Sequence, residues 1–381
     1  MEFSGFEPQK GEKKVEYLEL IYDLIFVYLI GRNNALLHPV ENGFVSGDAF
    51  LAYVLCTLAV IQIWNFSTFY INLYGRNGVR DHVFLFINMY LLYHMADGIS
   101  TGWQSSFYRF CLAWALILVN LGVQYLLELR HHALAPWETK QIRRKAAILL
   151  AEALLVGVHM LVYRLTGVSI AYVPILFGIA ATALSGRTND LVPVDFGHLS
   201  ERAMLYVVFT FGEMIIAISD YFAGEVTPSG LYFSLMAFLI VAGLFLSYEV
   251  LYNRIIDREM TTNGTGYMII HVFLIFALNN ISVSLEFMHR ETVALLPKTL
   301  FLGGSFVLYF VFLFLTALYA KRSCAFRCRF VYLLAGLCVG FFALMLLLRE
   351  EMVLNIAVSA VFVYCVFLLL YRRGRADRLP E

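Results

Sequence analysis

Two acidic residues stand inside an apolar stretch near the start of the chain. Glu19 and Asp23 lie four residues apart within VEYLELIYDLIFVYLIG, residues 15–31. A four-residue spacing on a helix puts both carboxylates on one face, one turn apart. Such groups must face protein, water or a cation rather than lipid. We therefore expect them to bind a coupling ion or substrate; the alternative is structural hydrogen bonding to neighbouring helices.

Further ionisable groups recur in later apolar segments. Glu201 and Arg202 open the seventh segment, Glu213 lies near its middle, and His271 lies one turn into the ninth. Histidine changes its charge near neutral pH, and an arginine can balance the acids. The expected coupling-ion or substrate site comprises Glu19, Asp23, Glu201, Arg202, Glu213 and His271.

The end of the second segment, IWNFSTFYINLYGRN, is unusually rich in amides, hydroxyls and aromatic rings. An interfacial aromatic belt explains tryptophan and tyrosine, but not the amides and hydroxyls. The third segment adds a histidine and an acid on one face. We expect these residues to line a hydrated cavity: Trp64, Asn65, Thr68, Tyr70, Asn72, His94 and Asp97.

The amino-acid composition indicates which kind of secondary structure positions these groups. Of 381 residues, 60% are hydrophobic and only 15% are charged, against about 25% charged in soluble proteins. This predicts an all-α, multi-pass membrane protein whose main partner is the lipid bilayer. A net charge of zero argues against nucleic acid as a partner. Six scattered cysteines and the absence of cofactor motifs predict neither a bound metal nor a cofactor.

A transmembrane helix needs about 20 mainly apolar residues, and the chain offers twelve such segments. They span residues 16–35, 48–74, 82–101, 107–130, 146–164, 168–186, 199–222, 229–254, 266–288, 299–320, 327–348 and 352–371. With this count, most of the 28 basic residues face one side of the membrane. The other side has only Arg32, Arg109, Arg164, Arg290, Lys298 and Arg349. Because basic residues concentrate in cytoplasmic loops, both termini are predicted to be cytoplasmic.

The two halves of the chain have matching segment spacing. An offset of about 182 residues carries most segment starts of the first half onto those of the second, and Glu19 onto Glu201. We interpret residues 1–190 and 191–381 as two six-helix repeats within one membrane domain. An even number of helices per repeat gives both repeats the same orientation.

The sequence resembles the bacterial low temperature requirement A family. Tyr17-Leu-Glu19-Leu-Ile-Tyr-Asp23-Leu-Ile-Phe-Val is similar to its opening motif, and His198-x-x-Glu201-Arg202 through Gly212-Glu213 is similar to its second. The stretch Trp64–Asn72 and His271 also match family features, whereas Ala203-Met204 replaces the family's Phe-Gly. The resemblance implies a multi-pass protein of the bacterial cytoplasmic membrane, and it implies no defined biochemical activity.

The favoured hypothesis is a proton- or cation-coupled secondary transporter of a small molecule whose identity the sequence does not define. Glu19, Asp23 and Glu213 would bind the coupling ion. An ion channel with acidic pore-lining groups is the second hypothesis. A membrane-embedded enzyme or lipid-handling scaffold is the third, although no soluble-enzyme motif occurs, so an enzyme is less expected. The sequence does not define the oligomeric state.

Overall fold

The computed structural model describes residues 13–99, 103–130, 134–187, 194–221, 227–324, 326 and 328–375. Twelve α-helices make up most of this part of the chain. They are α1 (Tyr17–Asn34), α2 (Gly47–Tyr74), α3 (Val79–Asp97), α4 (Trp103–Glu128), α5 (Pro136–Thr166), α6 (Tyr172–Arg187), α7 (Phe196–Tyr221), α8 (Pro228–Val250), α9 (Thr265–His289), α10 (Leu295–Leu315), α11 (Cys328–Leu347) and α12 (Met352–Arg375).

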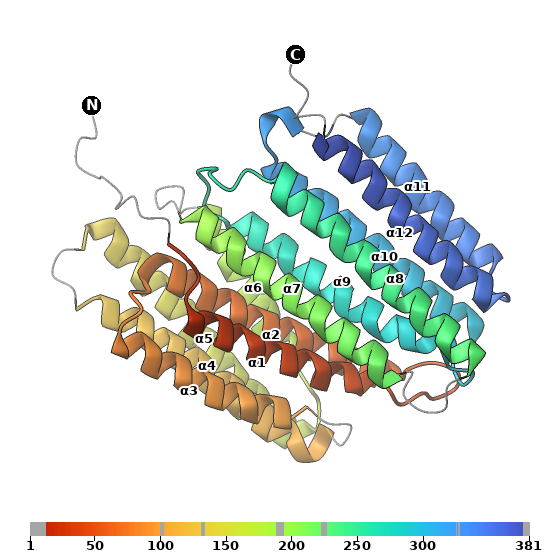
Figure 1. The fold of residues 1–381 in the computed structure, drawn as a ribbon. Helices are drawn as coiled ribbons and strands as arrows, with labels where there is room; N and C mark the ends of the chain where they lie inside the picture. Colours follow the sequence, from red (N-terminus) through yellow and green to blue (C-terminus); the bar gives the residue numbers. More distant parts are fainter. Residues whose placement is uncertain are drawn as a thin grey trace.

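The helices run side by side in one bundle, with short connections and alternating direction (Figure 1). Ten of those described are long and apolar enough to cross a membrane. Many large apolar side chains on the outside of the bundle are exposed, as lipid-facing positions require. The predicted all-α, multi-pass membrane fold is confirmed.

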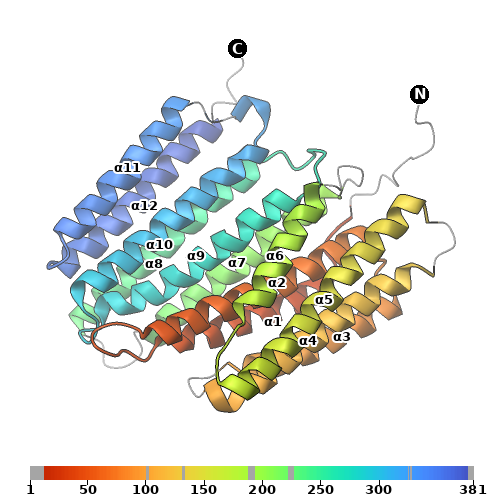
Figure 2. The same cartoon turned by 180° about the vertical axis from the view of Figure 1, so that it is seen from behind.

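The alternation places the start of α1 and the end of α12 at the same end of the bundle, seen from both sides in Figures 1 and 2. We call this the basic end, because most of the described basic residues lie there, in the connections and in the adjoining helix turns. Residues 1–12 lie outside the described residues. That the basic end is cytoplasmic stays a prediction.

Helix α5 begins at Pro136, well before the predicted start at residue 146. Proline is favoured in the first turn of a helix, and Glu138 accepts a hydrogen bond from the backbone N–H of Ala135 at 2.8 Å. The charged stretch that follows, Thr139–Lys145, therefore continues the apolar helix instead of forming a loop. The hydropathy pattern marked only the apolar part of this element.

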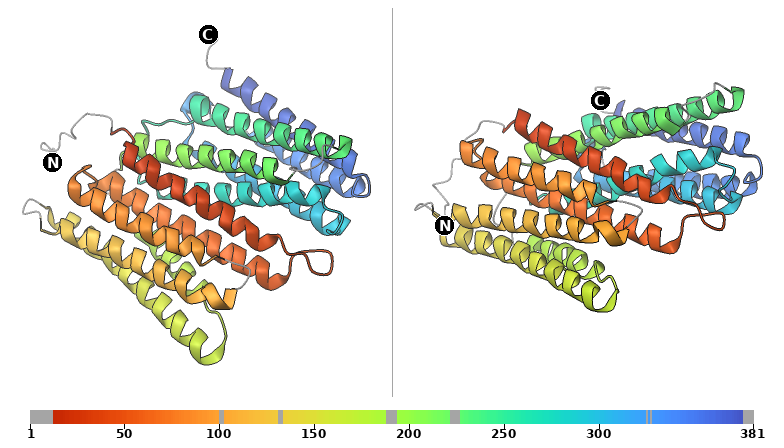
Figure 3. Two further views of the ribbon diagram at one scale, coloured as in Figure 1. Left: turned by 60° about the horizontal axis from the view of Figure 1, so that its bottom comes forward. Right: turned by 90° about the horizontal axis from the view of Figure 1, so that it is seen from below.

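Neighbouring helices correspond in the two halves. The pairs α1–α2, α1–α3, α3–α4, α4–α5, α5–α6 and α2–α6 have counterparts in α7–α8, α7–α9, α9–α10, α10–α11, α11–α12 and α8–α12. The halves meet through α1 and α2 against α7 and α9, and Figure 3 shows them side by side. This correspondence supports the repeat, which stays a prediction; its boundary at residues 190 and 191 falls outside the described residues.

Candidate functional site

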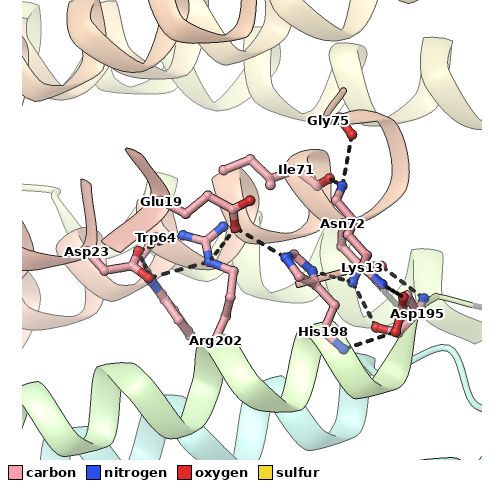
Figure 4. Close-up of polar contacts among 10 residues, drawn as sticks. All are labelled: Lys13, Glu19, Asp23, Trp64, Ile71, Asn72, Gly75, Asp195, His198 and Arg202. Atoms are coloured by element: carbon pink, nitrogen blue, oxygen red, sulfur yellow. Dashed lines mark hydrogen bonds and ion pairs between the residues drawn. The ribbon is translucent and has the colours of Figure 1, made fainter. Parts of the chain in front are cut away.

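Helices α1 and α7 pack against each other near the basic end, and both contact α2. Their contact brings Glu19 and Asp23 of α1 toward Arg202 of α7, and Trp64 of α2 lies beside them (Figure 4). Arg202 and Asp23 are fully buried, and Glu19 is 5% exposed. The predicted pairing of the two acids on one helical face is therefore seen in the structure, and both face protein.

Asp23 is the more firmly held of the two carboxylates. Arg202 Nη2 donates to Asp23 Oδ1 at 2.6 Å, and Arg202 Nε donates to Oδ2 at 3.4 Å. Trp64 Nε1 adds a third hydrogen bond to Asp23 Oδ1, at 3.0 Å. A two-point guanidinium contact fixes the orientation of a carboxylate as well as compensating its charge.

Glu19 is held more loosely. Its Oε2 lies 3.4 Å from Arg202 Nε and 3.2 Å from His198 Nε2. His198 and Arg202 are four residues apart on α7, so they occupy one helical face and flank the carboxylate together. Glu19 therefore shares with Asp23 the single guanidinium of the cluster.

The contact at Nδ1 of His198 determines which of its ring nitrogens carries the hydrogen. Asn72 exchanges two hydrogen bonds with the backbone of Asp195: its Nδ2 donates to the carbonyl at 2.8 Å, and its Oδ1 accepts from the N–H at 3.2 Å. This orients the Asn72 amide so that Nδ2, a donor, faces His198 Nδ1 at 3.1 Å. Nδ1 is thus an acceptor, and the hydrogen of a neutral imidazole sits on Nε2, toward Glu19.

The charges of the cluster do not balance within it. With His198 neutral, two carboxylates face one guanidinium, and Asp23 and Arg202 are fully buried. Removing a charge from water is costly unless it is paired and hydrogen-bonded, and Asp23 meets that requirement better than Glu19. One guanidinium N–H₂ group, Arg202 Nη1, has no hydrogen-bond partner among the described residues.

A cavity of about 1220 Å³ opens at the basic end, directly beside Glu19. Polar side chains from several elements line it, including Lys13, Glu16, Glu19, Asn72, Asp81 and Asp195. Neither Asp23 nor Arg202 is among the lining residues. Glu19 therefore stands between the cavity and the dry pair behind it.

Lys13 connects the chain before α1 to the end of α2. Its Nζ donates to the carbonyl of Ile71 and, at 2.9 Å, to that of Gly75. Cations are favoured at helix C-termini, where carbonyls lack partners. Burial lowers the pKa of Lys13 below the usual lysine value, and the negative charge of Glu19 opposes that shift.

The other predicted ion-site residues lie outside the cluster. Glu201 is half-buried and forms no hydrogen bond or ion pair with the described residues, because it points about 100° round α7 from Arg202. Glu213 lies three turns further along α7, where its carboxylate packs against Gly31 of α1. His271 on α9 donates from Nδ1 to the Tyr267 carbonyl at 2.9 Å and accepts from the Tyr248 hydroxyl at 3.1 Å.

The predicted cavity-lining residues of α2 point in different directions. Asn72 lines the large cavity and Trp64 belongs to the cluster. Tyr70 instead donates to Glu128 Oε1 at 2.7 Å. Asn65 and Thr68 are buried, and Asn65 borders a much smaller cavity against α6 and α9.

His94 and Asp97 on α3 do not pair with each other. Asp97 accepts from Arg109 Nη1 at 2.5 Å, in a partly exposed contact. The ring of His94 packs edge-on against Tyr90 and Tyr93. Both residues lie near the end of α3 opposite the basic end, away from the charge cluster.

Sequence reasoning did not assign roles to His198 or Lys13. His198 precedes Arg202 by one helical turn, so the spacing itself contains the signal that both face Glu19. Lys13 offered none, since its role depends on where α2 ends. Among the described residues, no group of three His, Cys, Asp or Glu side chains is placed to hold a metal ion.

The fold and site define a multi-pass helical membrane protein with a buried, charge-paired cluster at the floor of a polar cavity. The sequence model described as "Bacterial low temperature requirement A protein (LtrA)" matches residues 14–370. The chain therefore belongs to the LtrA family. None of the curated proteins matches it significantly.

Proposed function

We propose that this protein is a proton-coupled secondary transporter whose substrate binds in the large cavity at the basic end. The observation that carries the proposal is the contact of one cavity-lining acid, Glu19, with the buried Asp23–Arg202 pair. A transporter needs an ionisable group that water can reach, coupled to a group that water cannot reach.

Glu19 is suited to exchange a proton and Asp23 is not. Asp23 has two contacts from Arg202 and one from Trp64, and it is fully buried. Glu19 has only the longer contacts to Arg202 and His198, and it reaches the cavity. A proton arriving through the cavity would therefore bind Glu19 first.

Proton binding would change the charge of the cluster from unbalanced to balanced. With Glu19 neutral, Arg202 and Asp23 form a one-to-one pair. Closing the cavity over a neutral cluster costs less than closing it over an unpaired charge. A proton bound to Glu19 would thus favour a closed conformation that is disfavoured when Glu19 is ionised. Secondary transport requires such coupling between proton binding and conformation.

The same geometry ranks the alternatives. An open channel needs a continuous wet path, whereas the cavity ends at the dry Asp23–Arg202 pair. An acid/base enzyme needs its groups next to bound substrate, and His198 is committed to Asn72 and Glu19. Both classes remain outcomes of the test below.

The proposal is tested in proteoliposomes loaded with a pH-sensitive dye. Amino acids, organic cations, and monovalent and divalent metal salts are added in turn under an imposed pH gradient. We expect one class to drive a saturable proton flux. Glu19→Gln should abolish that flux, and Glu16→Gln, which changes another acid lining the same cavity, should retain it.

Other results would overturn the proposal. An ohmic current that does not saturate indicates a channel, and chemical conversion of lipid without a gradient indicates an enzyme. A flux of undiminished size in Glu19→Gln would remove the cluster from the coupling mechanism. Protein folding in each variant is checked by monodispersity in detergent.

A further inference from the structure

A second buried acid lies between α2, α5 and α6, away from the charge cluster. Glu152 of α5 is fully buried, and Gln62 Nε2 of α2 donates to its Oε2 at 3.4 Å. No lysine, arginine or histidine among the described residues forms an ion pair with it. Both side chains lie well inside long apolar helices.

Helix α6 closes over this pair at Gly178. A Cβ at that position would collide with the side chains of both Gln62 and Glu152. Glycine therefore allows the backbone of α6 to approach the carboxyl group directly. The close packing leaves no room for the hydration shell of an ionised carboxylate.

The carboxyl group of Glu152 must then be neutral. An isolated charge at the bilayer centre costs at least about 2.5–3.5 kcal/mol, and here no cation offsets that cost. Because Gln62 donates to Oε2, Oε2 acts as the acceptor and Oε1 carries the proton. The Gln62 amide is thereby oriented with its own oxygen free to accept.

Two buried oxygens of this pair have no hydrogen-bond partner among the described residues: Glu152 Oε1 and Gln62 Oε1. The first is a hydroxyl donor in the neutral acid and the second is an amide acceptor, so the two groups are complementary. A cavity of about 40 Å³ is lined by Gln62, Asn65, Gly178 and Thr182 together with apolar side chains, and Glu152 is not among its lining residues. The carboxyl group is therefore closed off even from this small cavity.

We propose that the Glu152 pocket is a proton-binding site, in which a neutral carboxyl group paired with the Gln62 amide joins α2, α5 and α6. The site goes beyond the Glu19 cluster and does not depend on transport. It takes a proton, and its occupancy keeps α6 packed against α2. Loss of that proton would force the carboxylate to find water and would separate these helices.

Infrared spectroscopy tests the site directly, because a protonated carboxyl group has a C=O band distinct from that of a carboxylate. The full chain is measured in an ester-free detergent at neutral pH, since lipid esters absorb in the same region. The difference spectrum between wild type and Glu152→Gln should contain one protonated-carboxyl band. Glu128→Gln, which removes an equally buried acid paired with Arg80, should remove no such band.

Gln62→Leu, with Glu152 intact, tests the pair. Removing the amide donor leaves the carboxyl C=O without its hydrogen bond, so the Glu152 band should move to higher frequency. A carboxylate band in place of the protonated one in the Glu152→Gln difference spectrum would overturn the proton site. An unmoved band in Gln62→Leu would overturn the pairing with the amide. Should Glu152→Gln fail to fold, a shifted band in Gln62→Leu still supports the site and an unmoved band still counts against it.

Discussion

The charge cluster and the Glu152 pocket are buried carboxyl sites that both contact helix α2, and they differ in how the carboxyl group is stabilised. Beside Trp64, Asp23 and Glu19 share the guanidinium of Arg202. Beside Gln62, Glu152 has only an amide donor and a glycine backbone against it. Gln62 and Trp64 are only two residues apart on α2, about half a turn, so they face different neighbouring helices.

The difference shows what decides the state of a buried acid in this bundle. Where a cation is within reach, the acid can stay ionised, but burying the cation then also costs desolvation free energy. Where only an amide is within reach, the acid must hold its proton. The first site contains an ion pair, and the second contains a neutral carboxyl group. Removing the cation should therefore destabilise the first site, whereas replacing the acid by its amide should hardly change the second.

The largest expected effect comes from removing the shared cation. Arg202→Leu leaves two buried carboxylates without compensation, and we expect the free energy of unfolding to fall by about 3–5 kcal/mol. Arg349→Leu is the control, because Arg349 pairs only with the exposed Glu350 among the described residues, and exposed ion pairs contribute little to stability. Denaturant titration in detergent micelles measures both.

The same contrast predicts a partial rescue. Adding Asp23→Asn to Arg202→Leu removes one uncompensated charge, so the double variant should lose less stability than the sum of the single losses.

Glu152→Gln should change the unfolding free energy by less than about 1 kcal/mol, since it replaces one neutral group by another of the same shape. Strictly additive losses, or a large loss in Glu152→Gln, would contradict the comparison.

A smaller effect is expected from the tryptophan that serves the charged site. Trp64→Phe removes the only hydrogen bond that Asp23 receives from α2, and bonds to charged groups contribute about 1.5–3 kcal/mol. Trp114→Phe is the control: that indole is equally buried, and its Nε1 has no hydrogen-bond partner among the described residues. Equal losses in the two variants would show that the bond to Asp23 contributes nothing.

The neutral site should respond to volume instead of charge. Gly178→Ala places a methyl group against Gln62 and Glu152, and overpacking costs about 1–3 kcal/mol. Gly212→Ala serves as the control, since a Cβ there meets no other atom within 4 Å. We expect thermal unfolding at a lower temperature for Gly178→Ala alone. A tolerated alanine would mean that α6 does not pack on the acid.

The smallest expected effect concerns Lys13, which joins the basic end to the charged site. Because burial lowers its pKa, the neutral amine forms at lower pH than in a fully hydrated lysine. The pH profile of its acylation should therefore be displaced to lower pH, relative to that of a lysine in a short unfolded peptide. Peptide mapping after pulse labelling measures this. Glu19→Gln should displace the profile further, because Glu19 stabilises the ammonium form.

The membrane class, the helix count and the common face of Glu19 and Asp23 could all be predicted from sequence. Hydropathy and a four-residue spacing are local properties, and a helix in lipid must satisfy its backbone internally whatever packs beside it. Even so, hydropathy missed the polar first turns of α5, because charged residues are equally able to form helix outside the bilayer.

What the sequence could not determine is which buried groups face one another. His271 and Glu213 have the same residue types as members of the cluster, yet they have other neighbours. Partner choice depends on the rotation of each helix and on its neighbours.

By itself, the sequence determined that this chain is a bundle of membrane helices in which a few acids must avoid lipid. Only the tertiary structure decided that Arg202 compensates Glu19 and Asp23, while Glu152 has no ion-pair partner among the described residues. The physical reason is that the cost of burying an acid is set by its own helix, but the means of offsetting that cost comes from helices distant in the sequence.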